Sequence, residues 1–143
     1  MDGEYELEDE LIYGPPTLLN ESVLLKPNDE KLAKIRNQLP TFLKCRGWTL
    51  VFSTALHGVS MKTFYRYSKE WLSSILFVKD QFGNVFGGFA SSPWVASENY
   101  TGTGESFLFK YLPEVEIYPW NDVDGTNSYF MLGKHDHIEM GAT

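Results

Sequence analysis

Hydrophobic residues recur with a helical period in two short stretches of the chain. Leu32, Ile35 and Leu39 stand at i, i+3 and i+7, which predicts a helix of about three turns over residues 29–39 with one face on a core. A second helix is predicted over residues 61–67, with one apolar side and one polar side. The apolar side consists of Met61, Phe64 and Tyr65.

Most other apolar residues alternate with polar ones, which is the period of a β-strand. Strands are predicted over residues 48–53, 75–79, 85–91, 107–111, 115–118 and 129–132. A five-residue turn containing Gly83 joins the second and third of these, so they form an antiparallel hairpin. Short strands broken by Gly, Pro and Asn, with two helices grouped early, predict an α+β domain: mainly an antiparallel β-sandwich with two short flanking helices.

The length of 143 residues fits one compact domain. Residues 1–13 are acidic and follow neither period, so we expect a disordered tail there and a folded domain over residues 14–143. No apolar run approaches the roughly 20 residues that cross a bilayer, and no secretory signal pattern opens the chain. Cys45 is the single cysteine, which excludes an internal disulfide and favours a reducing compartment. We therefore expect the cytoplasm, the nucleus or the cytosolic face of an organelle.

Charge is arranged in three blocks along the chain. Residues 1–25 carry a net charge of −7, residues 26–79 carry +7 and residues 80–143 carry −7, which gives −7 for the whole chain. The basic block either faces the acidic blocks within the fold or presents a polarised surface to a charged partner. We favour the intramolecular arrangement, because it removes self-repulsion without a partner.

The basic block contains a row of bases on the polar side of the second predicted helix. Lys62, Arg66 and Lys69 stand at i, i+4 and i+7, so they share one face and are the interaction candidates. With the aromatic residues nearby, such a row can follow a phosphate backbone, which leaves a nucleic-acid-associated module through residues 61–69 as one alternative. The acidic flanks disfavour that alternative, and we expect a protein-docking or solvated face.

The sequence contains no nucleotide-binding loop, zinc-protease motif or serine-hydrolase motif. Glu105 is the strongest candidate for chemistry, because it lies between Gly104 and the strand predicted to begin at Phe107. We favour a structural latch, in which its carboxylate accepts backbone amides and ties two loops together. The alternative is an acid–base enzyme in which Glu105 works with His57 or Asp80.

Histidine and cysteine offer weaker candidates. His135 and His137 would share a face of a strand and could both bind zinc, but a third ligand would have to come from elsewhere. We favour polar surface residues at the start of a strand, and we expect no metal and no cofactor. Cys45 lies beside Lys44 and Arg46, whose charge favours a reactive thiol, although simple packing accounts for it equally well.

Seven blocks of sequence follow one another in a characteristic order. They read WTLVFST at 48–54, HGVSMKTFYR at 57–66, ILFVKD at 75–80, GNVFGGFASSPW at 83–94 and YTGTGESFLF at 100–109, followed by Trp120 and NSYF at 127–130. In order and spacing they resemble the TLDc domain, which occurs at the end of oxidation resistance proteins and of nuclear receptor coactivator and TBC relatives. The resemblance covers residues 22–141, and the combination of blocks is what makes it specific.

The resemblance implies a fold and a function. The fold is a sandwich of two antiparallel sheets with flanking helices. The function is protection against oxidative stress and, for several relatives, binding to the vacuolar proton pump that regulates its assembly. No established catalytic centre comes with the family, so we expect a non-enzymatic protein-interaction module whose leading partners are subunits of that pump. By position, the motif residues of the family are Gly58, Asp80, Gly87, Gly104 and Glu105.

The resemblance also bears on the C-terminal end of the domain. The family continues past Gly141 through a glycine-rich strand and a tryptophan-containing stretch. We therefore expect residues 14–143 to form a TLDc-like domain that lacks its C-terminal portion. Such a sandwich would leave an unpaired strand edge and an open apolar inner face. The inner face would consist of residues such as Phe89, Phe109 and Phe130.

Overall fold

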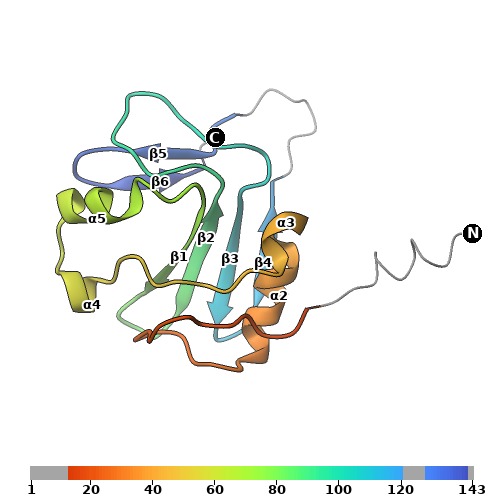
Figure 1. Cartoon of the computed structure of the whole chain (residues 1–143). Coiled ribbons are helices and arrows are strands. Elements are labelled where there is room, and N and C mark those ends of the chain that lie inside the picture. The colour runs from red at the N-terminus through yellow and green to blue at the C-terminus, as the bar shows by residue number, and fades with distance from the viewer. Residues whose placement is uncertain (1–12, 121–127, 142–143) are drawn as a thin grey trace, which may run out of the picture.

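The computed structural model describes residues 13–120 and 128–141, and these form two antiparallel sheets and four helices (Figure 1). The larger sheet has the order β1-β2-β3-β4 and the smaller sheet pairs β5 with β6. The strands are β1 Ser74–Lys79, β2 Val85–Ala90, β3 Phe107–Leu112, β4 Glu116–Pro119, β5 Met131–Gly133 and β6 Ile138–Met140. The helices are α2 Glu30–Gln38, α3 Thr41–Lys44, α4 Thr54–His57 and α5 Met61–Ser68. This arrangement confirms the predicted α+β class.

Helix α2 begins after Asp29, whose side chain bonds both to the helix and to strand β3. The side chain of Asp29 accepts a hydrogen bond from the backbone N–H of Lys31 and so caps the first turn. The same carboxylate accepts a hydrogen bond from the hydroxyl of Tyr111 on β3. Burial, followed by this bond, raises the pKa of Tyr111 above its ordinary value. The cap therefore joins the start of α2 to the larger sheet.

Helix α2 covers one face of the larger sheet and lies against β3 and β4 (Figure 1). Leu32 and Ile35 are fully buried there, as their period predicted. Phe89 and Phe109 are each only 2% exposed, so the predicted open inner face is wrong at both positions. The reason is that the helix itself supplies the second layer, and no further strand is needed to bury these rings.

Among the described residues, the opposite face of the larger sheet is covered at one end. The hairpin of β5 and β6 lies across that end (Figure 1), and Met140 packs closely on Gly88 and Leu108. A Cβ on Gly88 would lie 2.7 Å from the Met140 sulfur, so a larger residue there would displace the end of the Met140 side chain. The same face keeps exposed apolar side chains, which are Val78, Phe86, Leu108 and Tyr118.

The hairpin of β1 and β2 confirms the antiparallel pair predicted from the glycine-containing turn. Asp80 holds this turn closed, because its Oδ1 accepts the backbone N–H groups of Phe82 at 2.8 Å and Asn84 at 2.9 Å. Within β2, a Cβ on Gly87 would lie 1.7 Å from the carbonyl oxygen of Leu76. The family motif residues Asp80 and Gly87 therefore shape this hairpin.

The strand predicted over residues 48–53 does not form. Trp48 makes one isolated bridge with Leu18, and the residues that follow have no ladder partner. The backbone of Leu50 bonds instead to the side chain of Asn20, which accepts at 2.7 Å and donates at 3.3 Å. Ser53 then caps α4. The alternating pattern was real, but a side chain satisfied the backbone groups that a neighbouring strand would have paired.

The predicted tail over residues 1–13 falls mostly outside the described residues. Tyr13 is described and belongs to the folded part. Its backbone N–H donates to the side chain of Asn37 at 2.9 Å, and its carbonyl accepts from the same side chain at 2.7 Å. In the part of the chain that the structure describes, no helix is long and apolar enough to cross a bilayer.

Candidate functional site

Helix α5 carries the predicted interaction candidates, and its sequence explains why it forms. Ser60 caps it by accepting the backbone N–H of Thr63 at 3.3 Å. Phe64 and Tyr65 point inward and pack against the cluster of Ala90, Trp94 and Met131. The ring centroid of Phe64 lies 6.1 Å from that of Trp94. This packing holds α5 beside the smaller sheet and confirms the helix predicted over residues 61–67.

The outward side of α5 is basic. Lys62, Arg66 and Lys69 are all exposed, as their spacing predicted. None of the three forms a salt bridge with another described residue, although the Arg66 guanidinium lies 5.2 Å from the centre of the Tyr67 ring. No described acidic residue forms an ion pair with these charges. Six of the seven acidic residues of the first block lie at positions 2–10, outside the described residues, so the intramolecular arrangement that we favoured stays a prediction.

Exposed apolar side chains stand at both ends of the same helix. Val59 precedes it and is 91% exposed, while Leu72 and Trp71 follow it at 80% and 45%. Isolated exposed apolar residues are ordinary on a protein surface, but here they flank a row of unpaired bases. We name this region the α5 surface. It consists of Val59, Lys62, Arg66, Lys69, Trp71 and Leu72.

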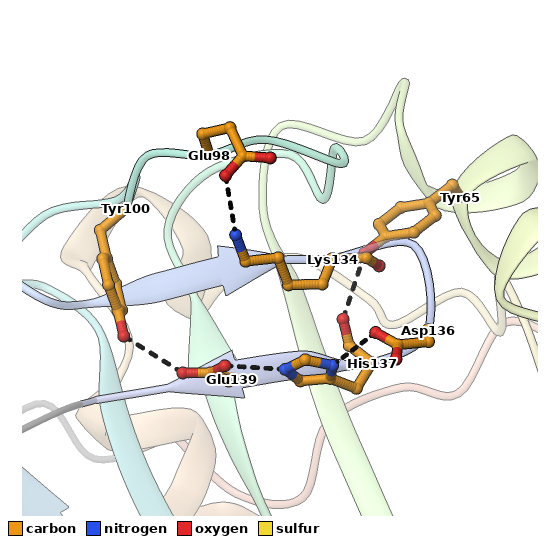
Figure 2. A network of polar contacts seen from close by, with 7 residues as sticks. All are labelled: Tyr65, Glu98, Tyr100, Lys134, Asp136, His137 and Glu139. Carbon is orange, nitrogen blue, oxygen red and sulfur yellow. Dashed lines mark hydrogen bonds and ion pairs between the residues drawn. The ribbon is translucent and has the colours of Figure 1, made fainter.

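Beneath α5, one tyrosine joins the helix to the hairpin of β5 and β6 (Figure 2). The Tyr65 hydroxyl donates to the carbonyl oxygen of Lys134. Burial, followed by the charge of Asp136, raises the pKa of Tyr65 above its ordinary value. Gly133 allows the contact, because a Cβ there would lie 2.8 Å from the Tyr65 oxygen and 2.3 Å from the Val95 carbonyl.

A histidine holds two carboxylates together in the same hairpin (Figure 2). The ring nitrogens of His137 lie 2.7 Å from Asp136 Oδ1 and 2.7 Å from Glu139 Oε2. Hydrogen bonding to Glu139 and then to Asp136 raises the pKa of His137, and its bonds lower the pKa of both carboxyl groups. Tyr100 donates to Glu139 at 3.1 Å, and so extends this network to the segment that flanks β5.

His135 and His137 do not share one face of a strand, as two zinc ligands on a strand would. His135 and His137 lie in the turn before β6, which begins at Ile138. Across the described ranges, no three His, Cys, Asp or Glu side chains are grouped so that they could hold a metal ion. His137 instead has a structural role in the hairpin, close to the polar strand start that the sequence favoured.

Glu105 is exposed and does not form the predicted latch. Among the described residues, its carboxylate accepts one hydrogen bond, at 3.4 Å from the hydroxyl of Thr103, and none from a backbone amide. It lines a shallow cavity of about 160 Å³ beside Trp120. The other lining residues are Gln38, Pro40, Gly104, Ser106, Phe107 and Pro119. Gly104 has no left-handed backbone and no close neighbour, so it is not required at this turn.

The proposed acid–base partners of Glu105 lie elsewhere. The strand registers pair Lys79 with Val85 and Phe89 with Phe107, so Asp80 and Glu105 are at opposite ends of β2. The side-chain amide of Asn84, and then backbone N–H groups, lower the pKa of Asp80 in its turn. His57 Nδ1 accepts the backbone N–H of Ser53 at 3.0 Å. Neither Asp80 nor His57 lines the cavity beside Glu105.

Gly58 and Cys45 are two further residues that the sequence analysis named. Gly58 ends α4 with φ +83°, a conformation that favours glycine. Cys45 is exposed at the end of α3, and none of the described contacts assigns it a redox role.

Sequence reasoning missed the Tyr65 bond to Lys134, because the two residues are 69 positions apart. It also missed the exposed apolar residues at the two ends of α5, Val59 and Leu72.

The fold and the α5 surface define a class of protein: an α+β domain of antiparallel sheets with an exposed basic helix. The family model for the TLDc domain matches residues 19–143, and the chain therefore belongs to this family. Nuclear receptor coactivator 7 of Homo sapiens is 37% identical over 138 residues, which cover 96% of this chain and 14% of that protein. Oxidation resistance protein 1 is 39% identical over 127 residues in both Rattus norvegicus and Xenopus laevis, which cover 88% of this chain and 14% of each relative. The chain thus spans a small part of the length of these relatives.

Proposed function

We infer that this chain is a non-catalytic protein-interaction module that contributes to oxidative-stress resistance by binding the vacuolar proton pump and regulating its assembly. The α5 surface is the observation that carries this proposal. Its three bases have no acidic partner among the described residues, and exposed apolar side chains stand at both ends of the helix. A surface of this composition is typical of a protein interface, which combines apolar anchors with a polar rim.

The relatives support the oxidative-stress part of the proposal. Several of them carry the name oxidation resistance protein 1, and this chain aligns with their sequences over 88% of its own length. The pump is the leading partner because the family resemblance implies it. A pump-binding role would place the chain at the cytosolic face of an organelle.

The enzyme alternative receives less support from the geometry. Glu105 is exposed, and Asp80 and His57 lie away from the cavity that it lines. An acid–base pair needs both groups within hydrogen-bond reach of one substrate position. The arrangement therefore favours binding over catalysis.

Binding to purified pump subunits, measured by interferometry on the immobilised chain, tests the proposal. We expect the wild type to bind and Lys62→Glu with Arg66→Glu to weaken binding about tenfold or more, since like charges then face each other. Lys31→Glu with Lys34→Glu is the matched control, because it makes the same charge change on the exposed side of α2. Absence of binding by the wild type, or an equal loss in both variants, would contradict the proposal.

A further inference from the structure

The α5 surface has a linear arrangement that restricts what it can bind. At a helical rise of about 1.5 Å per residue, Lys62 and Lys69 lie about 10 Å apart along the axis, with Arg66 between them. Val59 lies before this row, and Trp71 and Leu72 follow it. The helix therefore presents three charges in a short row, and exposed apolar residues lie in the segments that precede and follow it.

We propose that the α5 surface binds an acidic amphipathic helix of a partner protein. This inference rests on the proposed function and adds the chemistry of the partner. Carboxylates at i, i+4 and i+7 of the partner helix have the same axial spacing as Lys62, Arg66 and Lys69. One apolar residue beyond each end of the acidic row would then contact Val59 at one end and Leu72 at the other.

The helix is held in place before any partner arrives. Tyr65 bonds it to the carbonyl of Lys134, and Phe64 packs against Trp94 and Phe52, with ring centroids 6.1 Å and 5.5 Å away. A surface fixed from beneath loses little conformational entropy on binding, which favours a rigid ligand such as a helix.

A nucleic acid fits this surface less well than a protein. Stacking on bases requires aromatic rings, and Trp71 and Tyr67 offer two that are 45% and 40% exposed, but the most exposed apolar residues at the ends of the helix are the aliphatic Val59 and Leu72. Three bases also give a short electrostatic footprint on a chain whose net charge is −7. The aliphatic ends are better matched by the apolar side chains of a protein helix.

Fluorescence anisotropy with designed peptides tests the inference on the full chain. The probe is a labelled helical peptide of about 18 residues, long enough to be helical alone, with Glu at i, i+4 and i+7 and Leu beyond both ends. A second peptide replaces the three Glu residues with Gln, and a third carries Pro in the centre to abolish the helix. A labelled single-stranded oligonucleotide is measured in parallel.

Two protein variants are compared, each with a matched control. Lys62→Glu with Arg66→Glu reverses the charges, and Lys31→Glu with Lys34→Glu is its control on α2. Val59→Ser with Leu72→Ser removes the apolar ends, and Phe82→Ser is its control, because Phe82 is equally exposed at 80% in the β1–β2 turn. Circular dichroism confirms that each variant keeps its fold.

We expect the acidic helix to bind about tenfold more tightly than the Gln and Pro peptides, and both α5 variants to lose at least that factor while the controls do not. Tighter binding of the oligonucleotide than of the acidic helix, or equal binding of all three peptides, would overturn the inference. If pump subunits bind through α5 but the acidic helix does not, the inference fails and the proposed function stands. If the acidic helix binds but the pump does not, the proposed function fails and the inference stands.

Discussion

Helices α2 and α5 are both short and amphipathic, and each has an arginine in its last turn, yet the two arginines have different surroundings. Arg36 on α2 donates to three backbone carbonyls, those of Gly14 at 3.1 Å, Pro15 at 3.0 Å and Lys44. Its guanidinium also lies 4.8 Å from the centre of the Tyr13 ring. Arg66 on α5 is exposed and lies over the ring of Tyr67 alone among the described contacts.

The difference comes from the chain around each helix. The segment that begins at Tyr13 and the end of α3 both pass the C-terminal turn of α2, and their carbonyls need donors there. Within residues 13–120 and 128–141, no such segment bonds to the outward side of α5. The same residue in the same position of a helix therefore stabilises the fold in one case and remains available for binding in the other.

The largest expected effect on stability distinguishes the two arginines, each of which is replaced by alanine in a separate variant. Arg36→Ala leaves three carbonyls without their donor and should lower the free energy of unfolding by about 2 to 4 kcal/mol. Arg66→Ala should change it by less than about 0.5 kcal/mol, because the side chain is exposed. Urea denaturation followed by circular dichroism measures both. Equal losses in the two variants would show that Arg66 also has a structural role.

A smaller effect should follow from loosening α5 at its inner side. Tyr65→Phe removes the hydroxyl that donates to Lys134 and keeps the ring, so we expect a loss of about 1 kcal/mol in the free energy of unfolding. Tyr67→Phe is the matched control on the exposed side of the same helix. Hydrogen exchange should show faster exchange in α5 for the first variant only. Unchanged protection in both would mean that packing of Phe64 alone holds the helix.

The His137 network should give a pH dependence smaller than either of these effects, because the ring is half exposed. Its pKa is raised above the ordinary value of 6.5, so its contribution to stability is complete below that pH and is lost as the pH rises through the folded-state pKa. His137→Gln should therefore be less stable than the wild type at about pH 5.5, and the difference should shrink towards about pH 8.5. A difference that grows with pH would contradict the assigned hydrogen bonds.

Periodicity in the sequence predicted the elements that bury one face along their whole length. Helices α2 and α5 and the hairpin of β1 and β2 were all found in this way. The single-turn helices α3 and α4 have four residues each, which is too short for a period to be visible. The strand predicted from Trp48 failed because Asn20, about thirty positions away, bonds the backbone of Leu50.

In the candidate site too, some features could be predicted from local periodicity and others depend on contacts between distant residues. The spacing of Lys62, Arg66 and Lys69 was enough to predict one exposed basic face, because that face depends on the helix alone. The attachment of α5 to the hairpin depends on Tyr65 and Lys134, whose contact exists only in the folded chain. The role of Lys62, Arg66 and Lys69 in partner binding stays a prediction, which the binding experiments above test.

The smallest expected effect concerns Glu105, which resembles Arg66 in being exposed. Glu105→Gln should change the free energy of unfolding by less than about 0.5 kcal/mol, because its carboxylate accepts only the Thr103 hydroxyl among the described residues. Glu114→Gln is a matched control at an exposed position before β4. Thermal melts of both variants measure the effect. A clear loss of stability for Glu105→Gln alone would restore the latch that the sequence predicted, and would show that this carboxylate bonds groups beyond the described contacts.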